Sequence, residues 1–223
     1  MRWLADGVQL LSSPPLLSFN VYLVDDVLLD TGTRHARRRI LRQLHGRSVN
    51  AVALTHVHPD HQGACGLICN SLAVPLWCGA SDADAMEAGI SNYSREGAVQ
   101  RLLTRVWGGD GHPVARRLRE GDRVGSFTVL ETPGHTPGHV SLWRESDRTL
   151  IAGEVLNDIH SLIFPLGRFR PQEPAAFSTA DRRRNRASAR RLAALEPALA
   201  CFCHGPPLRD TRRFVELAAS LPD

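Results

Sequence analysis

Apolar runs alternate with amphipathic stretches along the first third of the chain. Residues 19–24 and 27–30 are two apolar runs separated by two aspartates, which predicts a β-hairpin. Residues 33–45 place isoleucine and leucine on one helical face, which predicts an amphipathic helix. Residues 48–56 then form a nearly continuous apolar run, as expected of a buried strand.

The middle of the chain continues this alternation and then changes character. Residues 63–72 are predicted to be helical and residues 74–78 to form another strand. Residues 81–107 contain two further helical segments, each opening with a serine that can cap it. Glycines and a proline then break the pattern, so residues 81–113 are predicted to be a helical insertion that forms one wall of a site.

The second half repeats the rhythm of strands and helices. Two strand–helix series, with helices to cover two sheets, predict an α/β sandwich formed by a single domain over residues 1–223. The expected elements are strands within 126–134, 139–145, 149–155 and 198–205, and helices at 173–197 and 208–221.

Composition limits the functions that the chain can have. Its 223 residues carry a net charge of +4, and every one of its 27 basic residues is arginine. Chemistry that needs a lysine, such as Schiff-base formation, is therefore excluded. The arginines are scattered among acidic residues, so we expect no nucleic-acid partner. Five cysteines without paired spacing argue against a disulfide-stapled domain and are interpreted as small buried residues.

The N-terminal residues do not resemble an export signal. Asp6 interrupts the first apolar stretch, and Pro14 and Pro15 break the next one. No apolar run reaches the ~20 residues that span a bilayer. We therefore expect a cytoplasmic protein that does not contact membranes; its oligomeric state cannot be deduced from the sequence.

The strongest chemical signal is the run His56-Val57-His58-Pro59-Asp60-His61. Residues i and i+2 of an extended segment point to the same face, so His56 and His58 can bind one ion together. Pro59 turns the chain, which lets Asp60 and His61 approach a second ion. Imidazole and carboxylate ligands suit zinc, and also iron or manganese.

Further ligands are expected where other strands end. His135, Glu154 and His204 each follow a predicted strand and stand beside a glycine that permits a sharp turn. Together with the first cluster they predict a centre of two divalent metal ions.

These motifs resemble those of the metallo-β-lactamase superfamily. His56–His61 is similar to that family's HxHxDH signature, Thr132–His139 (TPGHTPGH) to its second motif, and Asn20–Gly32 to its leading strands. The resemblance covers nearly the whole chain. It implies a four-layer αββα sandwich, in which two mixed β-sheets are flanked by helices.

The resemblance also implies roles for individual residues. Glu154 would bridge the two ions, Asp30 would orient a ligand histidine, and His139 would be structural. The remaining ligands would divide into two sets, His56, His58 and His135 for one ion and Asp60, His61 and His204 for the other.

One position departs from the family pattern. The bridging residue is typically aspartate, and this sequence has Glu154. The extra methylene shifts the carboxylate by about one carbon–carbon bond, which can change the metal separation, the preferred ion, or the occupancy of one site. The number and identity of the ions therefore stay open.

The expected reaction is hydrolysis of a small ester, thioester or lactone. Two ions roughly 3.5–4 Å apart would activate a hydroxide, with Asp60 orienting it and shuttling its proton. The alternatives are a metal-dependent nuclease or phosphodiesterase, and a mononuclear-iron oxidoreductase of the persulfide dioxygenase type. Candidate contacts for a small-molecule substrate are His160, Phe164 and Arg168 in the loop 157–170.

Overall fold

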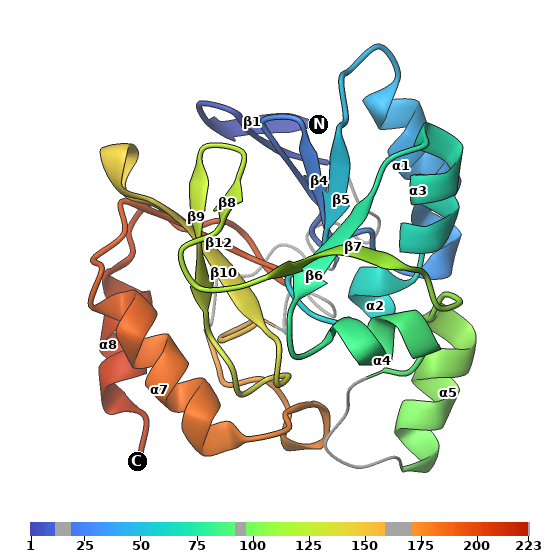
Figure 1. Ribbon diagram of the computed structural model, residues 1–223. Coiled ribbons are helices and arrows are strands. Elements are labelled where there is room, and N and C mark those ends of the chain that lie inside the picture. Colours follow the sequence, from blue (N-terminus) through green and yellow to red (C-terminus); the bar gives the residue numbers. More distant parts are fainter. Residues whose placement is uncertain (12–18, 92–96, 159–170, 223) are drawn as a thin grey trace.

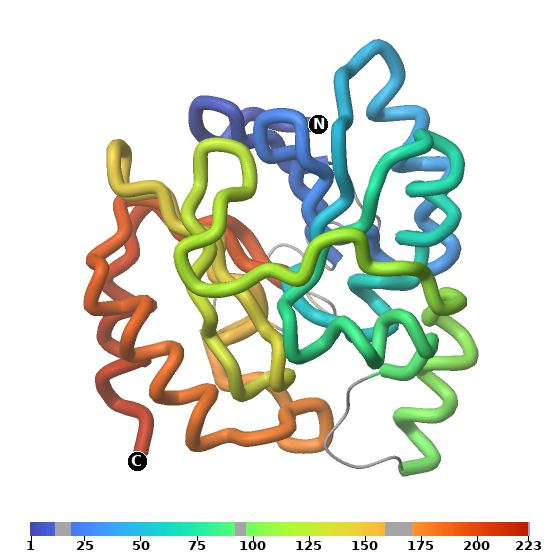
Figure 2. Tube along the Cα trace, in the orientation of Figure 1, coloured from blue at the N-terminus to red at the C-terminus, as the bar shows by residue number. Residues whose placement is uncertain are grey.

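Two β-sheets face each other and helices cover their outer faces in the computed structural model of the protein (Figure 1). The structure describes residues 1–11, 19–91, 97–158 and 171–222. The four layers confirm the αββα sandwich that the sequence predicts. The first half of the chain forms one side of the sandwich and the second half forms the other (Figure 2).

The first sheet has seven strands in sequence order. Strands β1 to β4 are antiparallel, whereas β4, β5, β6 and β7 run parallel to one another. The predicted hairpin is confirmed, with Val24 opposite Val27. The strands are β1 (Arg2–Ala5), β2 (Val8–Leu10), β3 (Tyr22–Val24), β4 (Val27–Leu29), β5 (Ala51–Ala53), β6 (Leu76–Gly79) and β7 (Val114–Leu118).

The second sheet has five strands in the order β12-β11-β10-β9-β8. Only the pair of β11 and β12 is parallel; the other pairs are antiparallel. Both sheets are therefore mixed. The strands are β8 (Arg123–Val124), β9 (Phe127–Glu131), β10 (Val140–Arg144), β11 (Thr149–Gly153) and β12 (Leu199–Phe202).

The helices lie in two outer layers. Those of the first half flank the first sheet, and α7 and α8 cover the second sheet (Figure 1). The α-helices are α1 (Arg37–Leu44), α2 (Pro59–Gln62), α3 (Cys65–Leu72), α4 (Ala83–Ala88), α5 (Ala98–Trp107), α7 (Arg182–Ala193) and α8 (Arg212–Ser220). Short 3₁₀ helices are η1 (Arg34–Ala36), η2 (Glu145–Asp147) and η3 (Ala176–Ser178).

Alternation along each strand divides the core into layers. Ala51 and Ala53 of β5 face the cluster between the two sheets, whereas Val52 packs toward the helices of the first half. In β11, Ile151 faces the first sheet, and Leu150 packs under α7 and α8. Strands buried on both faces explain why these segments are almost wholly apolar.

The predicted helix over residues 173–197 is wrong in its extent. Helix α7 begins only at Arg182, where the Asp181 carboxylate caps it by accepting a hydrogen bond from the Arg184 amide at 3.0 Å. Glu173 pairs with Arg182 at 2.7 Å, which brings the preceding segment back against the helix. Ala175, Ala176 and Ala180 precede this cap and favour a helix, which is why the predicted helix extended too far.

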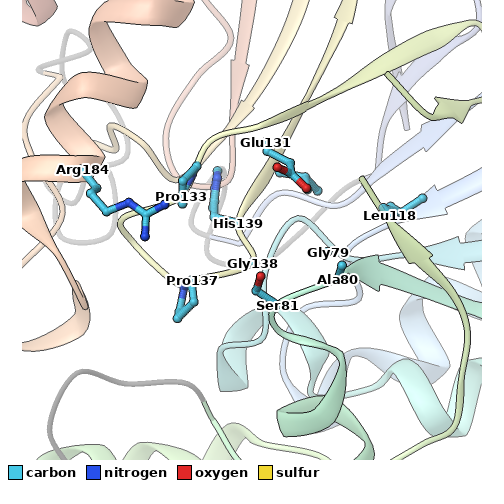
Figure 3. Close-up of a pocket in the computed structure, with 11 residues that line it drawn as sticks. Gly79, Ala80, Ser81, Leu118, Glu131, Pro133, Pro137, Gly138, His139 and Arg184 are labelled. Carbon is cyan, nitrogen blue, oxygen red and sulfur yellow. The ribbon is translucent and has the colours of Figure 1, made fainter. Parts of the chain in front are cut away.

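Close backbone contact joins β6 to the turn between β9 and β10. Gly79 at the end of β6 lies against the carbonyl of Gly138, so that a Cβ at position 79 would overlap this oxygen (Figure 3). The contact fixes the turn that carries His135 relative to the first sheet.

Gly79→Ala is expected to lower the free energy of unfolding by about 1–3 kcal/mol, because the methyl group forces the two backbones apart. The control is Gly66→Ala in α3, where the added Cβ meets only ordinary contact at 3.5 Å from His112. That change removes a helix-interior glycine and is expected to stabilise the protein by up to about 1 kcal/mol. Urea titration of both variants measures the difference, and equal stabilities would contradict the proposed backbone contact.

Candidate metal centre

The seven predicted ligands come from separate segments that meet at one end of the two sheets. His56 and His58 follow β5, and Asp60 and His61 lie in the four-residue helix α2, which begins at Pro59. The other three stand at the ends of strands of the second sheet, with His135 in the turn after β9, Glu154 directly after β11 and His204 shortly after β12.

The side chains form two groups. Ligand atoms of His56, His58, His135 and Glu154 all lie within 4.8 Å of one another. Those of Asp60, His61 and His204 form a second group of the same dimensions. The structure thus brings together every residue of both predicted ligand sets.

Glu154 stands between the two groups. Its Oε2 atom lies 3.5 Å from Nε2 of His56 and 3.3 Å from that of His135. On the other side it lies 3.4 Å from Nε2 of His61 and 3.2 Å from that of His204. The contacts with His56, His61 and His135 lack the geometry of hydrogen bonds, so these three Nε2 atoms are buried without a hydrogen-bond partner.

Three of these histidines are held through Nδ1, and in two of them the partner is a hydroxyl group. Nδ1 of His56 lies 3.0 Å from the Thr55 hydroxyl, and Nδ1 of His135 lies 3.3 Å from the Thr179 hydroxyl. A hydrogen bond at Nδ1 fixes the ring orientation and leaves Nε2 for a metal. Buried imidazoles with free Nε2 atoms around a carboxylate fit a transition-metal centre.

Asp30 contacts the ring of His61, one of the predicted ligands, which is the position that the family resemblance implies for it. Its buried carboxylate lies 3.2 Å from Nδ1 of His61 and accepts hydrogen bonds from the Thr55 amide at 2.8 Å and from the Cys203 thiol at 3.4 Å. Asp30 adopts φ = 60°, a left-handed conformation that aspartate tolerates better than most residues. The carboxylate therefore couples the first sheet to the His61 ring.

The backbone and side chain of Glu154 are both fixed. Its amide donates to Nε2 of His139 at 2.9 Å, and Nδ1 of His139 lies 2.8 Å from the Thr132 hydroxyl. Both nitrogens of His139 are thus engaged, which agrees with the structural role expected for it. Asn157 donates from Nδ2 to Oε1 of Glu154 at 3.0 Å. This bond leaves Oε2 directed at the imidazoles.

Burial and neighbouring charges shift the pKa of several predicted ligands. Burial lowers the pKa of His56 and His58 well below the usual value, so both imidazoles are neutral and can donate a lone pair to a metal. Burial would raise the pKa of Asp60, but His61 and His204 lower it to about 2. His135 and His204 likewise overcome burial and hold the pKa of Glu154 well below its usual value.

Comparison with known proteins identifies the family. The sequence profile of the Metallo-beta-lactamase superfamily matches residues 16–204, which include all seven predicted ligands. The chain belongs to this superfamily. Family, fold and buried His/Glu centre together are those of a metal-dependent hydrolase.

Relatives in the superfamily include hydrolases. The chain is 28% identical to the probable metallo-hydrolase YflN of Bacillus subtilis over 202 residues, which are 82% of this chain and 76% of YflN. It is 31% identical to a hydroxyacylglutathione hydrolase of Bdellovibrio bacteriovorus over 111 residues, 48% of this chain and 34% of that enzyme. The second match therefore covers only part of each protein.

Solved structures of superfamily members have the same fold. The metallo-beta-lactamase family protein TTHA1429 of Thermus thermophilus superposes with a TM-score of 0.69 at 26% identity, covering 97% of this chain and 80% of its own. TTHA1623, solved in a di-iron-bound form, has the same TM-score at 29% identity, covering 90% of this chain and 94% of its own.

In the described part of the chain, no helix has the length and hydropathy needed to cross a bilayer.

A cavity of about 300 Å³ opens onto this superfamily centre. His58, Asp60, Glu154 and His204 lie at its base, and α5 and η3 contribute to its walls. A smaller cavity of about 80 Å³ is lined by Pro137 and Gly138, with Arg184 at its edge (Figure 3). The larger cavity is the candidate substrate site, because it alone of the two reaches both ligand groups.

Some functional residues were missed by the sequence analysis. Cys203 was interpreted only as a small buried residue, but it lies in a group with His56 and His61 and donates to Asp30. Burial raises the pKa of this thiol to about 12, so it donates as a neutral group. Asn157 gave no signal in the sequence. The candidate substrate contacts His160, Phe164 and Arg168 lie outside the described residues.

Asp82 was also missed, although it connects the two main motifs. Its fully buried carboxylate accepts hydrogen bonds from the Val57 amide at 3.3 Å, the Thr136 hydroxyl at 2.6 Å and the Gly138 amide at 2.8 Å. Asp82 therefore ties the turn of His56 and His58 to the turn of His135.

Asp82→Asn is expected to lower the free energy of unfolding by about 1–3 kcal/mol. Either orientation of the amide places its NH₂ group against a backbone N–H, of Val57 or of Gly138. Asp84→Asn is the control, because Asp84 is exposed and pairs with Arg117, and a surface pair contributes little. Thermal unfolding measures both; a loss confined to Asp84→Asn would refute the bracing role of Asp82.

Proposed function

We propose that residues 1–223 form a single hydrolase domain that cleaves a small ester, thioester or lactone with the help of two divalent metal ions. Zinc is the proposed metal, with iron and manganese as alternatives. The helical segment at about 81–113 forms one wall of the site. His56, His58 and His135 would hold one ion, Asp60, His61 and His204 the other, and Glu154 both.

One observation carries this proposal. Nε2 atoms of His56, His61 and His135 are buried without a hydrogen-bond partner and surround one carboxylate oxygen. Leaving a buried polar atom unsatisfied costs about 1–3 kcal/mol, so a cluster of three is strong support for a ligand that satisfies them together. A cation accepts lone pairs from imidazole nitrogens and balances the negative charges of Glu154 and Asp60.

The metal ions and the side chains of the centre would have different roles in the reaction. A bound divalent ion supplies Lewis acidity, which lowers the pKa of water and polarises a carbonyl oxygen. Asp60 is ionised at neutral pH, and it lines the cavity, so its carboxylate can accept a proton from the attacking water and orient it. Asn157 holds Glu154 in place, and Asp30 holds His61.

The choice of acyl chemistry over phosphodiester cleavage is supported by the position of the arginines. Helix α7 carries the arginine-rich surface and lies on the opposite side of the molecule from α5 (Figure 1). Arg182 and Arg186 pair with Glu173, and Arg191 pairs with Glu120. None of these three arginines lines the cavity. Relatives named as hydrolases of hydroxyacylglutathione add support for acyl transfer to water.

Metal content provides the first test. Protein reconstituted with zinc is expected to bind two equivalents and to lose thermal stability after chelation, since a ligand at 1,000 times its Kd stabilises by about 4 kcal/mol. His58→Ala should lose metal and hydrolysis together, whereas His45→Ala, an exposed residue of the same type, should keep both. Elemental analysis and hydrolysis of thioester, lactone and phosphodiester substrates decide the matter. Fully active protein without metal would refute the proposal.

Asn157→Leu tests how Glu154 is held. Losing the Nδ2 donor frees the carboxylate to rotate away from the imidazoles, so metal affinity is expected to fall about 10- to 100-fold. Asn70→Leu, on the exposed side of α3, is the matched control. Competition with a chromogenic chelator measures both affinities. An Asn157→Leu protein with unchanged affinity would show that Glu154 does not depend on this bond.

A further inference from the structure

The walls of the larger cavity are apolar above the charged base. Val99, Leu103 and Trp107 of α5 line it at intervals of four residues, so they form one stripe along the helix. Phe19 and Phe177 line it from other segments. Val99 and Phe177 are 56% and 50% exposed, a large apolar area next to a polar centre.

The stripe is part of a fixed wall. The Phe19 ring packs edge-on against the rings of Trp107 and His204, with centroid distances of 5.5 Å and 5.7 Å. It therefore connects the apolar wall with the ligand groups. The buried side chain of Gln100 donates to the Phe177 carbonyl at 2.9 Å and ties α5 to η3. Arg34 donates to the Gly108 carbonyl and holds the end of α5 against η1.

The arginines of α5 line a different cavity from its apolar stripe. Arg101 and Arg105 of this helix line a separate cavity with Thr104. Among the described residues that line the larger cavity, no arginine is present, and the charged groups are those of the centre. An anionic group on this wall would lose its hydration without gaining a partner, which is costly.

We infer that the α5 wall binds the acyl part of the substrate, and that this part is an uncharged aliphatic chain. The inference rests on the proposed function, since it places the scissile carbonyl at the base of the cavity beside Asp60 and Glu154. The chain then runs along Leu103 toward Val99. A free phosphate or a nucleic-acid backbone does not fit this wall.

The experiment compares zinc-reconstituted protein on p-nitrophenyl esters from acetyl to octanoyl, together with a six-carbon ester that ends in a carboxylate. Each added methylene is expected to raise kcat/KM about three- to fourfold until the cavity is filled. The terminal carboxylate should lower kcat/KM more than about tenfold relative to the uncharged chain of equal length. A series without dependence on chain length would overturn the inference and leave the hydrolase function intact.

Variants locate the effect on the helix. Leu103→Ala should lower the ratio of octanoyl to acetyl kcat/KM about tenfold, because it removes apolar contact from the wall. Leu102→Ala is the matched control: Leu102 is 59% exposed and neighbours Leu103, but it does not line the cavity. Equal ratios in the two variants would overturn the assignment of the wall.

A binding measurement separates this inference from the proposed function. Aliphatic carboxylates of increasing length are titrated with the change in thermal midpoint as readout, in wild type and in Leu103→Ala. Length-dependent stabilisation in wild type that Leu103→Ala reduces, without hydrolysis of any ester, thioester or lactone, would keep the acyl site and refute the hydrolase. Stabilisation that is independent of length would overturn the acyl site whether or not esters are cleaved.

Discussion

The meeting of four imidazoles at one carboxylate oxygen is the constraint on which the structure depends. Glu154 is 6% exposed, and its Oε2 lies 3.2–3.5 Å from Nε2 of His56, His61, His135 and His204. Groups of this kind destabilise a fold unless something satisfies them, because buried polar atoms are normally hydrogen-bonded. The cluster is therefore suited to a bound cation and does not stabilise the fold as an apolar core would. Other contacts of the sandwich have to hold it in place.

Those other contacts cross between segments that are distant in sequence. Asn20 donates hydrogen bonds to the Phe202 carbonyl at 2.8 Å and to the Gly205 carbonyl at 2.7 Å. These bonds attach the start of the first sheet's hairpin to the segment on both sides of His204. Asp30 and Asp82 do the same for the turns of His61 and His135. Each of these carboxylate or amide groups satisfies backbone groups close to the end of a strand. The strand ends stay close to one another because side chains replace the missing ladder partners.

The sequence predicted what is local, and this includes most of the residues that the structure brings together in the two groups. Three histidines and an aspartate within six residues have no explanation in packing, and glycines mark the turns of His135, Glu154 and His204. The strand β7 was not predicted, because its alternating arginines resemble a polar surface and its neighbour β6 is 35 residues earlier in the chain. Asn157 and Asp82 were missed for a related reason. Their partners are fixed only by the tertiary fold, and a single amide or carboxylate has no pattern of its own.

The apolar wall and the charged centre share one cavity, and this has a consequence for the chemistry. An aliphatic group that fills the space beside Leu103 and Phe177 displaces water from the mouth of the cavity. Electrostatic interactions of Asp60 and Glu154 with the substrate then act in a medium of lower effective dielectric constant, where they are stronger. Substrates that are too short to fill the space beside this wall would leave the centre hydrated. In the proposed reaction, recognition of the acyl chain and activation of the carbonyl would therefore be one physical event, since the group that binds is also the group that excludes water.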